Sequence, residues 1–394
     1  MRNGSCGSVY AANCRLIGFE DIKNGFMREG WEYKRLNEVC DKGSSNIVIS
    51  KLTDNHGEYP LFGASGLVKN IDFYHQESPY IGIVKDGAGV GRVNIYPAYS
   101  SLVGTMQYIY PKEGHSLDYI KYFLVKLDLS HLVSGATIPH IYFKDYGKEI
   151  IPLPPKSVQL EIVSELDQIN ELIRLKKEQL KDYDNLAQSI FYEMFGDPVE
   201  NDKGWEVYLW AELYDTILGK MLDQKKQIET DVQLPYLGNT NVMWGHFDLE
   251  NLKVMSFSEK EIKKLQLHIG DLLICEGGES GRCAIWKRSD SKILFQKAIH
   301  RARAKVDSII PEYTMFWLRN IKQLGGLKNY ISKSTIEHLT GKKLNSIPVP
   351  LPPLPLQQEF SSRISQIERQ KAEVSNAIAD LETLLASRMQ YWFE

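Results

Sequence analysis

Several features that are common in secreted, membrane-bound and metal-binding proteins are missing from this sequence. It has five cysteines, at positions 6, 14, 40, 275 and 283, and no Cys-x-x-Cys spacing. This pattern predicts reduced thiols in a cytoplasmic protein, neither a disulfide framework nor a zinc site. No apolar run approaches the ~18 residues that a membrane span needs. Residues 1–29 also lack the basic and apolar regions of a secretory signal.

Catalytic motifs are missing as well. The sequence has no Asn-Pro-Pro-Tyr-like loop for base flipping, no Gly-x-x-x-x-Gly-Lys-Ser/Thr loop for ATP and no acid–acid–lysine nuclease set. Its nine histidines show no metal-ligand spacing. We therefore expect a non-catalytic chain without a metal or cofactor of its own. The alternative is an enzyme with an unfamiliar site near the Gly-rich turns described below.

The sequence does contain a proline-rich step followed by a long heptad pattern, and it contains both twice. Ile151–Pro155 reads Ile-Pro-Leu-Pro-Pro, and 198 residues later Val349–Pro353 reads Val-Pro-Leu-Pro-Pro. Proline is favoured directly before a helix, and apolar residues at alternating spacings of four and three predict a coiled-coil seam. The first seam is Ile162, Leu166, Ile169, Ile173, Lys176, Leu180, Tyr183, Ala187, Ile190 and Met194. The second is Phe360, Ile364, Ile367, Lys371, Val374, Ile378, Leu381, Leu385, Arg388 and Trp392.

The segments before the two steps also repeat. Gly30-Trp31 is answered by Gly204-Trp205, the turn Lys85–Arg92 by Cys275–Arg282, and Thr137-Ile-Pro-His140 by Thr335-Ile-Glu-His338. We predict an internal duplication in the α/β class, with two similar mixed α/β domains and two long helices. The expected segments are a lead at 1–29, a domain at 30–155, a helix at 156–196, a linker at 197–203, a domain at 204–353 and a helix at 354–394. The offset between the copies grows by 24 residues, which predicts insertions in loops of the second domain.

The charge of the chain is unevenly distributed. The formal net charge is −3, yet residues 204–353 hold 21 basic against 17 acidic residues, and 282–305 hold eight basic residues and one acid. Alternation in 296–305 places four cations on one strand face, namely Lys297, Arg301, Arg303 and Lys305. This face is predicted either to bind DNA phosphates or to be a solvated strand surface.

Other candidate residues lie near the repeated landmarks. The Gly-rich turns could present N–H groups to phosphate, with Lys85, Arg92 and Arg282 adding charge, or they could be tight turns that only glycine fits. Threonine, histidine and lysine side chains before each proline step could bind bases or phosphates, or could close the domain structurally. These residues are Thr137, His140 and Lys144 in the first copy and Thr335, His338, Lys342 and Lys343 in the second.

Taken in order, these landmarks resemble the specificity subunits of type I restriction–modification systems over nearly the whole chain. The resemblance rests on Gly30-Trp31, the turn Gly87–Gly91, Thr137-Ile-x-His140, the step Ile151–Pro155, Gln159-x-Glu161 and their second copies. It implies two target-recognition domains that read a bipartite DNA site, one half-site each. It also implies that the two helices pair as an antiparallel coiled coil that sets the spacer, which agrees with the order of the segments along the chain.

The resemblance further implies partners that supply the chemistry. These are two methyltransferase subunits and restriction or translocase subunits, which use S-adenosylmethionine, ATP and Mg. It favours an acidic helix flank as the partner-binding surface, although such a flank is more often solvated: Glu161, Glu165, Glu171, Glu178 and Asp182. The alternative to a DNA-recognition subunit is a coiled-coil scaffold whose globular domains bind protein or glycan.

Overall fold

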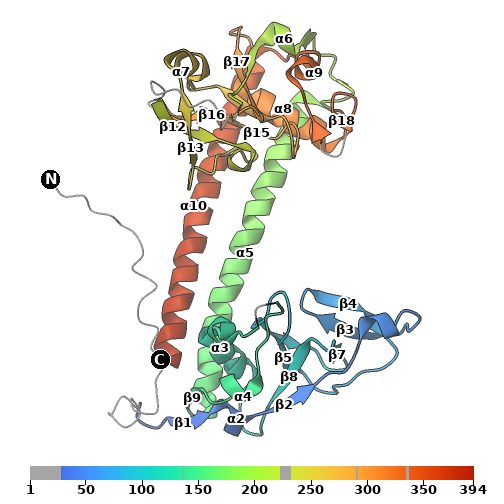
Figure 1. The fold of residues 1–394 in the computed structure, drawn as a ribbon, viewed down its shortest axis with the longest axis vertical. Coiled ribbons are helices and arrows are strands. Elements are labelled where there is room, and N and C mark those ends of the chain that lie inside the picture. Colours follow the sequence, from blue (N-terminus) through green and yellow to red (C-terminus); the bar gives the residue numbers. More distant parts are fainter. Residues whose placement is uncertain (1–27, 136, 222–231, 290–291, 334–336) are drawn as a thin grey trace, which may run out of the picture. The chain divides into compact units, whose positions relative to one another are not determined.

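The chain divides into two units, each with its own hydrophobic clusters. The computed structural model describes residues 28–135, 137–221, 232–289, 292–333 and 337–394. Unit 1 joins the residues up to Lys177 to Asn376–Glu394, and unit 2 is Glu178–Ser375. Each unit thus contains one globular domain and a part of both long helices (Figure 1). No helix among the described residues is long and apolar enough to cross a bilayer.

Unit 1 is built on two sheets and a strand pair. Its main antiparallel sheet has the order β2 (Cys40–Ser44), β8 (Met106–Pro111), β5 (Tyr80–Val84), β6 (Val93–Tyr96). A smaller sheet has the order β4 (Gly66–Ile71), β3 (Tyr59–Gly63), β7 (Ser101–Leu102), and β1 (Glu32–Arg35) pairs with β9 (Ile150–Leu153). The helices are α3 (Leu117–Leu127), which packs on the main sheet, and the short turns α2 (Leu36–Val39), η1 (Ile49–Lys51), η2 (Leu129–Leu132) and α4 (Phe143–Tyr146).

Unit 2 repeats this plan. Its main sheet has the order β11 (Tyr214–Leu218), β17 (Ile299–Ala304), β14 (Leu272–Cys275), β15 (Cys283–Ile285). The smaller sheet has the order β13 (Lys253–Phe257), β12 (Val232–Leu237), β16 (Leu294–Phe295), and the strand pairs are β10 (Val207–Leu209) with β20 (Pro348–Pro350) and β18 (Ser332–Lys333) with β19 (Glu337–His338). The helices are α6 (Trp210–Leu213), η3 (Asn239–Asn241), α7 (Glu259–Leu265), α8 (Pro311–Gln323) and α9 (Gly341–Asn345).

The matching strand orders confirm the predicted duplication of two mixed α/β domains. The expectation that insertions in the second copy lie in loops holds only in part. The two residues that join β3 to β4 are matched by 238–252 between β12 and β13, which include the 3-10 turn η3. Helix α7, between β13 and β14, is a second addition and is not a loop. The domain boundaries predicted from the sequence stay a prediction.

The central strands explain why continuous apolar runs occur in the sequence. All five residues of β5 are buried, because the strand is covered on both faces. Ile81 and Ile83 belong to the hydrophobic cluster that contains α3, whereas Tyr80 and Val84 belong to the cluster around the smaller sheet. Strand β14 divides its side chains between two clusters in the same way. Each domain therefore has one core on each side of its main sheet.

A buried glutamine fastens each proline step to its domain. Helix α5 (Lys156–Phe195) begins directly after Pro155, and α10 (Leu354–Phe393) begins directly after Pro353. The Gln159 amide, 3% exposed, donates to the Pro154 carbonyl at 3.0 Å and accepts the Ser116 N–H at 3.2 Å.

The second copy reproduces this arrangement. The Gln357 amide, 0% exposed, donates to the Pro352 carbonyl at 2.7 Å and accepts the Ile310 N–H at 3.0 Å. Tyrosine hydroxyls bind a second carbonyl of each step at 2.7 Å: Tyr119 to Pro152, and Tyr313 to Pro350. Each long helix is therefore anchored to its domain by satisfied buried polar groups.

The long helices pass each other antiparallel within each unit. In unit 1, Trp392 donates to Glu165 at 3.0 Å, and Lys177 pairs with Glu382 at 2.8 Å. In unit 2, Lys371 pairs with Asp184 at 2.9 Å, and the ring of Phe191 lies 5.7 Å from that of Phe360. Every residue of both predicted seams is buried or half-buried, so the predicted seam faces are confirmed. Knobs-into-holes packing of a coiled coil stays a prediction.

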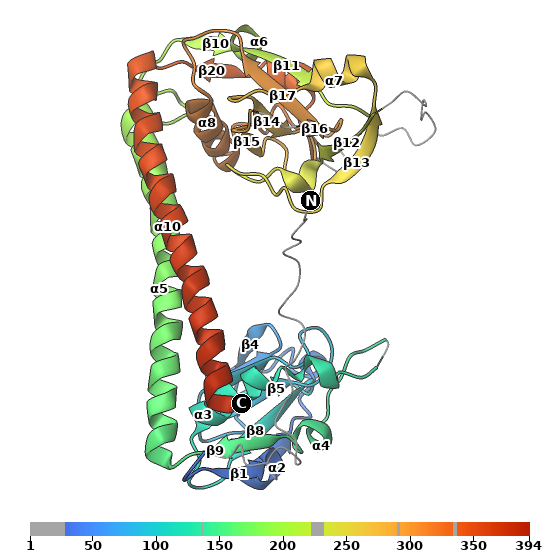
Figure 2. The same cartoon turned by 90° about the vertical axis from the view of Figure 1, so that its left-hand side faces the viewer.

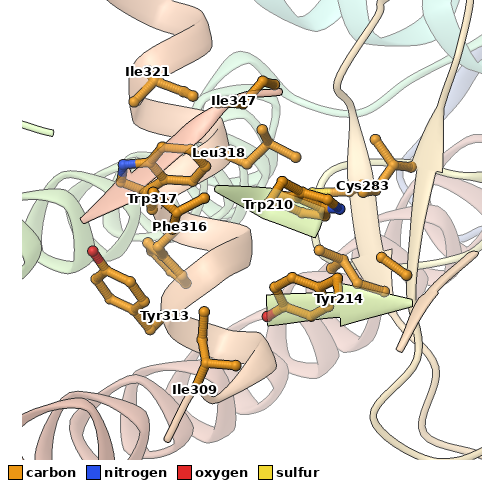
Figure 3. Close-up of a cluster of buried hydrophobic side chains, with 14 of the residues drawn as sticks. Trp210, Tyr214, Cys283, Ile309, Tyr313, Phe316, Trp317, Leu318, Ile321 and Ile347 are labelled. Atoms are coloured by element: carbon orange, nitrogen blue, oxygen red, sulfur yellow. The ribbon is translucent and has the colours of Figure 1, made fainter. Parts of the chain in front are cut away.

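Each domain core is completed by the end of the helix that belongs to the other repeat. In unit 1, Met389 and Phe393 of α10 are buried in the cluster around α3, and Figure 2 shows the end of α10 beside that helix. In unit 2, Phe191 and Phe195 of α5 join the cluster formed by α6, β11 and α8. Figure 3 shows this cluster, in which the rings of Trp210 and Tyr214 stack with centroids 4.6 Å apart.

This exchange of helix ends predicts a local effect of truncating Phe393. The Phe393 side chain is 4% exposed, and its ring lies 5.1 Å from that of Tyr119 and 6.0 Å from that of Phe123. We expect Phe393→Ala to lower the free energy of unfolding by about 3–5 kcal/mol. Hydrogen exchange should show lost protection in α3 and unchanged protection in α8.

The matched control is Leu384→Ala on the same helix, because Leu384 is 45% exposed. It should change stability by less than about 0.5 kcal/mol. Equal loss of protection in α3 and α8 would show that the end of α10 does not belong specifically to the core of unit 1.

Candidate nucleic-acid interface

Four loops meet at one edge of unit 1, at the ends of β5 and β8. We call this surface loop edge 1; it consists of residues 45–51, 85–92, 103–105 and 134–144, of which the structure describes all but residue 136. Backbone hydrogen bonds of 2.8–3.0 Å join each loop to the next: Gly104 N–H to Ile47, Lys85 N–H to Thr105, and Gly87 N–H to Pro139. The loops therefore form one connected frame.

Unit 2 has the same frame, which we call loop edge 2. It consists of residues 219–221, 276–282, 296–298 and 337–343. The joining bonds are 2.7–2.9 Å long: Lys297 N–H to Lys220, Glu276 N–H to Ala298, and Leu339 N–H to Glu276. The Gly-rich turns and the histidine-containing segments, which the sequence singled out separately, thus lie side by side in both units. Thr335 lies outside the described residues.

The Gly-rich turns have a clear structural reason for their glycines. Gly87, Gly91 and Gly281 have φ angles of +84°, +88° and +91°, a region that other residues rarely adopt. The arginine that ends each turn is bound internally: Arg92 donates to the Ala64 carbonyl at 2.8 Å, and Arg282 donates to the Asn239 carbonyl at 2.7 Å. These contacts favour the tight-turn interpretation, while phosphate binding by the turns stays a prediction.

The backbone bonds also correct the alignment of the two turns. Lys85 and Glu276 occupy equivalent places, because each donates its N–H to the turn before β8 or β17 and accepts an N–H from the histidine-containing segment. The sequence alignment of Lys85 with Cys275 is therefore wrong by one residue. The second turn is one residue shorter, and an acid stands where the first copy has a cation.

The basic strand β17 is largely engaged within unit 2. Arg301 is 5% exposed and donates to Asp215 at 3.1 Å. Arg303 makes a bidentate pair with Asp271, with both bonds at 2.7 Å, and Asp271 is 1% exposed. Burial lowers the pKa of Arg301, whereas the hydrogen bond to Asp271 raises the pKa of Arg303.

The alternative prediction, that this strand face is a solvated surface, is therefore wrong for Arg301. In the matching strand β8, the two equivalent positions hold Tyr108 and Tyr110, whose rings stack with centroids 5.9 Å apart. DNA contact by Arg301 and Arg303 stays a prediction.

The remaining predicted cations are distributed over both loop edges and their surroundings. Lys144, Lys297 and Lys342 are exposed, and Lys343 is half-buried. Lys85 lies 3.9 Å from Asp86, and the exposed Lys305 donates to the Ala211 carbonyl at 3.0 Å. The structure therefore brings Lys85, Lys144, Lys297, Lys342 and Lys343 to the loop edges and leaves Lys305 beyond them.

The threonine and histidines that the structure describes belong to the same surfaces. Thr137 and His338 are exposed. His140 is half-buried, and its Nδ1 lies 3.2 Å from the Ile138 carbonyl. Both histidines form a backbone bridge with the Gly-rich turn, which agrees with a domain-closing role and leaves a side-chain role in binding as a prediction.

The five acidic residues on the flank of the first long helix differ in their exposure. Glu161, Glu171, Glu178 and Asp182 are exposed, and Glu171 pairs with Arg174 at 2.6 Å. Glu165 is half-buried instead. It accepts hydrogen bonds from Arg388 and Trp392 of α10, and the bond from Arg388 holds the pKa of Glu165 below its usual range. Partner binding by the five residues stays a prediction.

Sequence reasoning missed the apolar residues on loop edge 1. Val48 and Ile49 are each 49% exposed, and Ile138 and Tyr142 are 62% and 47% exposed. Short apolar runs in the sequence are more often buried than exposed, so nothing in Asn46-Ile-Val-Ile49 marked it as a surface. Among the described residues, no three His, Cys, Asp or Glu side chains gather as a metal site would require.

The family model and the similar proteins all point to one family. The model of the type I restriction modification DNA specificity domain matches twice, over residues 28–182 and 202–382. The EcoKI specificity subunit of Escherichia coli strain K12 is 24% identical over 70% of this chain and 63% of its own length. The EcoBI specificity subunit of Escherichia coli is 21% identical over 64% of this chain, which spans 60% of that relative. The MjaVIII specificity subunit of Methanocaldococcus jannaschii is 22% identical over 89% of both chains.

Solved structures agree on the fold. The type I restriction–modification S subunit from M. genitalium superposes with a TM-score of 0.55 at 14% identity, covering 94% of this chain and 97% of that one. A chain from a structure of the complex assembly and conformational transition of the type I R-M system has a TM-score of 0.60 at 18% identity, covering 93% and 98%. At these identities the likeness is one of fold.

The environment of Arg303 predicts which cations support the structure and which remain free to bind DNA. Arg303→Ala would leave the Asp271 carboxylate buried without its partner, so we expect stability to fall by about 3–5 kcal/mol. Lys297→Ala is the matched control, because Lys297 is exposed on loop edge 2. It should leave stability unchanged and lower the salt dependence of DNA binding by about 0.9 per lost phosphate contact. Denaturant unfolding and binding at several salt concentrations measure both effects.

A different outcome would return β17 to the DNA interface. That outcome is a loss of DNA affinity and salt dependence in Arg303→Ala without any loss of stability.

Proposed function

Because this chain belongs to the family of type I restriction modification DNA specificity domains, we propose that it is the DNA-recognition subunit of a type I restriction–modification complex. One observation carries the proposal: two loop edges with matching backbone frames present different side chains. Lys85 is matched by Glu276, and Gly104 is matched by Lys297. A shared frame with divergent side chains suits a protein that reads two different base sequences with one docking geometry.

The two edges would read the two halves of a bipartite site, one half-site for each unit. We propose that the paired helices set the spacer between the half-sites. Helix α5 has 40 residues, and a helix of that length extends ~60 Å at ~1.5 Å per residue. Major-groove sites one DNA turn apart are separated by ~34 Å, so the helices are long enough for this role.

The chemistry would come from partner subunits. We propose that the chain is not an enzyme, that methyltransferase subunits supply S-adenosylmethionine-dependent methylation, and that restriction or translocase subunits supply ATP- and Mg-dependent cleavage. The sequence motifs for these reactions are absent from this chain, as described above. Its action on DNA would take place in the cytoplasm.

The first long helix offers a surface for a methyltransferase subunit. In unit 1 a groove of about 640 Å³ runs along α5 and is lined by apolar and acidic side chains, among them Leu160, Leu172, Asp167 and Glu171. Leu160 and Leu172 are 54% and 47% exposed. Apolar residues flanked by carboxylates suit a partner surface with an apolar centre and a basic rim. Two copies of the methyltransferase subunit would serve the two half-sites.

Methylome sequencing tests the proposal. In cells that carry the chain with its methyltransferase partner, we expect methylation of one bipartite motif. Exchanging residues 204–353 for the matching domain of another specificity subunit should change one half of that motif and leave the other half unchanged. The unmodified chain, expressed with the same partner, is the control.

Two results would argue against this function. DNA binding that is competed equally by unrelated sequences would favour a scaffold whose domains bind other ligands. A change in both halves of the motif would show that the two units do not read independently.

The proposed spacer role makes a separate prediction. We would insert one heptad into each long helix, after Lys177 in α5 and after Ser375 in α10, so that both seams keep their period. The insertion adds ~10 Å along the helices, which corresponds to ~3 bp and a rotation of about 100° on DNA. The variant should therefore lose its parental site.

Methylation of DNAs that differ only in spacer length is the measurement. Circular dichroism and thermal unfolding serve as controls that the helices and both domains still fold. A folded variant that keeps the parental spacer preference would show that the helices do not set the distance.

A further inference from the structure

An apolar groove lies on loop edge 1 beside the Gly-rich turn. The loop after β2 is pinned, because the Ser45 hydroxyl binds the Leu102 carbonyl and Gly104 donates to Ile47 at 2.8 Å. Ile47 is 8% exposed and packs into the core, whereas the next two residues, Val48 and Ile49, are each 49% exposed. They line a groove of about 490 Å³ together with Asn46, Ser50, Val103, Gly104 and Thr105.

Two lysines lie near this groove. Lys51 lies two residues after Ile49 and is exposed. Lys85 is also near, because its N–H binds the carbonyl of Thr105 at 3.0 Å, and Thr105 lines the groove; its side chain lies 3.9 Å from Asp86. Single exposed apolar residues are ordinary on protein surfaces. Here two adjacent apolar residues are held by a pinned backbone near two lysines. This arrangement is expected where apolar side chains contact a partner whose surrounding groups are anionic.

Building on the proposed function, we propose that this groove reads an A·T pair in the half-site of unit 1, with Val48 and Ile49 packing on the thymine 5-methyl group. The methyl group is the apolar feature of base edges in the major groove, where apolar side chains recognise it. Lys51 and Lys85 bind the flanking phosphates and fix the register. Val48 and Ile49 are thus specificity-determining residues for one half-site.

Unit 2 carries different side chains at several of the groove positions. The residues equivalent to Val103, Gly104 and Thr105 are Gln296, Lys297 and Ala298, because β7 and β16 pair in the same register with β3 and β12. Lys220 occupies the position of Ile47, because its carbonyl accepts the Lys297 N–H as that of Ile47 accepts the Gly104 N–H, and its side chain pairs with Glu261 at 2.7 Å. The amide of Gln296 and the exposed Lys297 suit polar base edges and phosphates, at places where unit 1 has Val103 and Gly104.

Deoxyuridine provides the test, because it differs from thymidine only by lacking the 5-methyl group of the base. The full chain is assembled with its methyltransferase partner, and the half-site of unit 1 is taken from the domain exchange described above. Each thymine of that half-site is replaced in turn by deoxyuridine, and the dissociation constant is measured. We expect one position to weaken binding about four-fold, the effect of one buried methyl group at ~0.8 kcal/mol.

A double variant shows which residues make the contact. In Val48→Ser with Ile49→Ser, binding to the thymine duplex should weaken and the four-fold penalty for deoxyuridine should disappear. The matched control is Val125→Ser on α3, whose side chain is 46% exposed and lies off the loop edge. It should keep the full penalty. Unfolding measurements and unchanged reading of the second half-site show that the variants are folded.

Three outcomes are informative beyond the expected one. A half-site without any A·T pair overturns the inference, and so does a wild-type chain that tolerates deoxyuridine at every position. A penalty that persists unchanged in the double variant also overturns it. In all three cases the chain still reads DNA and the proposed function stands, whereas a complete lack of sequence-specific binding would refute the proposed function itself.

Discussion

The architecture depends on the hydrogen bonds that fasten each proline step. A buried carbonyl needs a hydrogen-bond donor, and the carbonyls of Pro154 and Pro352 find one in a side chain. Gln159 and Gln357 supply these donors and at the same time accept an N–H from the start of α3 or α8. This side chain and its tyrosine neighbour hold the start of each long helix against its own domain, and the first turns of the helix then pack into the core of that domain.

The duplication preserves backbone contacts more faithfully than side chains. The arginine after each Gly-rich turn donates to an equivalent carbonyl in both copies, and the loops of both edges are joined in the same order. The side chains on this frame differ in charge and size. On the loop edges, divergence therefore changes what the surface can bind while the backbone frame stays the same.

The sequence predicted the periodic and repeated features well. Heptad spacing identified both seams, and the repeated landmarks identified two domains of one fold, because local pattern and proline chemistry determine these features. The role of β17 was not predictable in this way. Asp215 and Asp271, which bind Arg301 and Arg303, lie 86 and 32 residues away in the sequence, and no local pattern reports them. The exposed Val48 and Ile49 were missed for a related reason, since exposure depends on which distant segments cover a loop.

Unit 1 is built from two separate segments of the chain, and this affects the order in which its core can form during synthesis. Unit 2 is made of consecutive residues, whereas the core of unit 1 needs Met389 and Phe393, which are translated more than 250 residues after α3. Domains generally fold as units and in the order in which they leave the ribosome. In this chain the order is reversed: the second domain can complete its core while the first still lacks two of its buried side chains. The nascent first domain therefore leaves the place of Met389 and Phe393 in its core open until the end of α10 has been made.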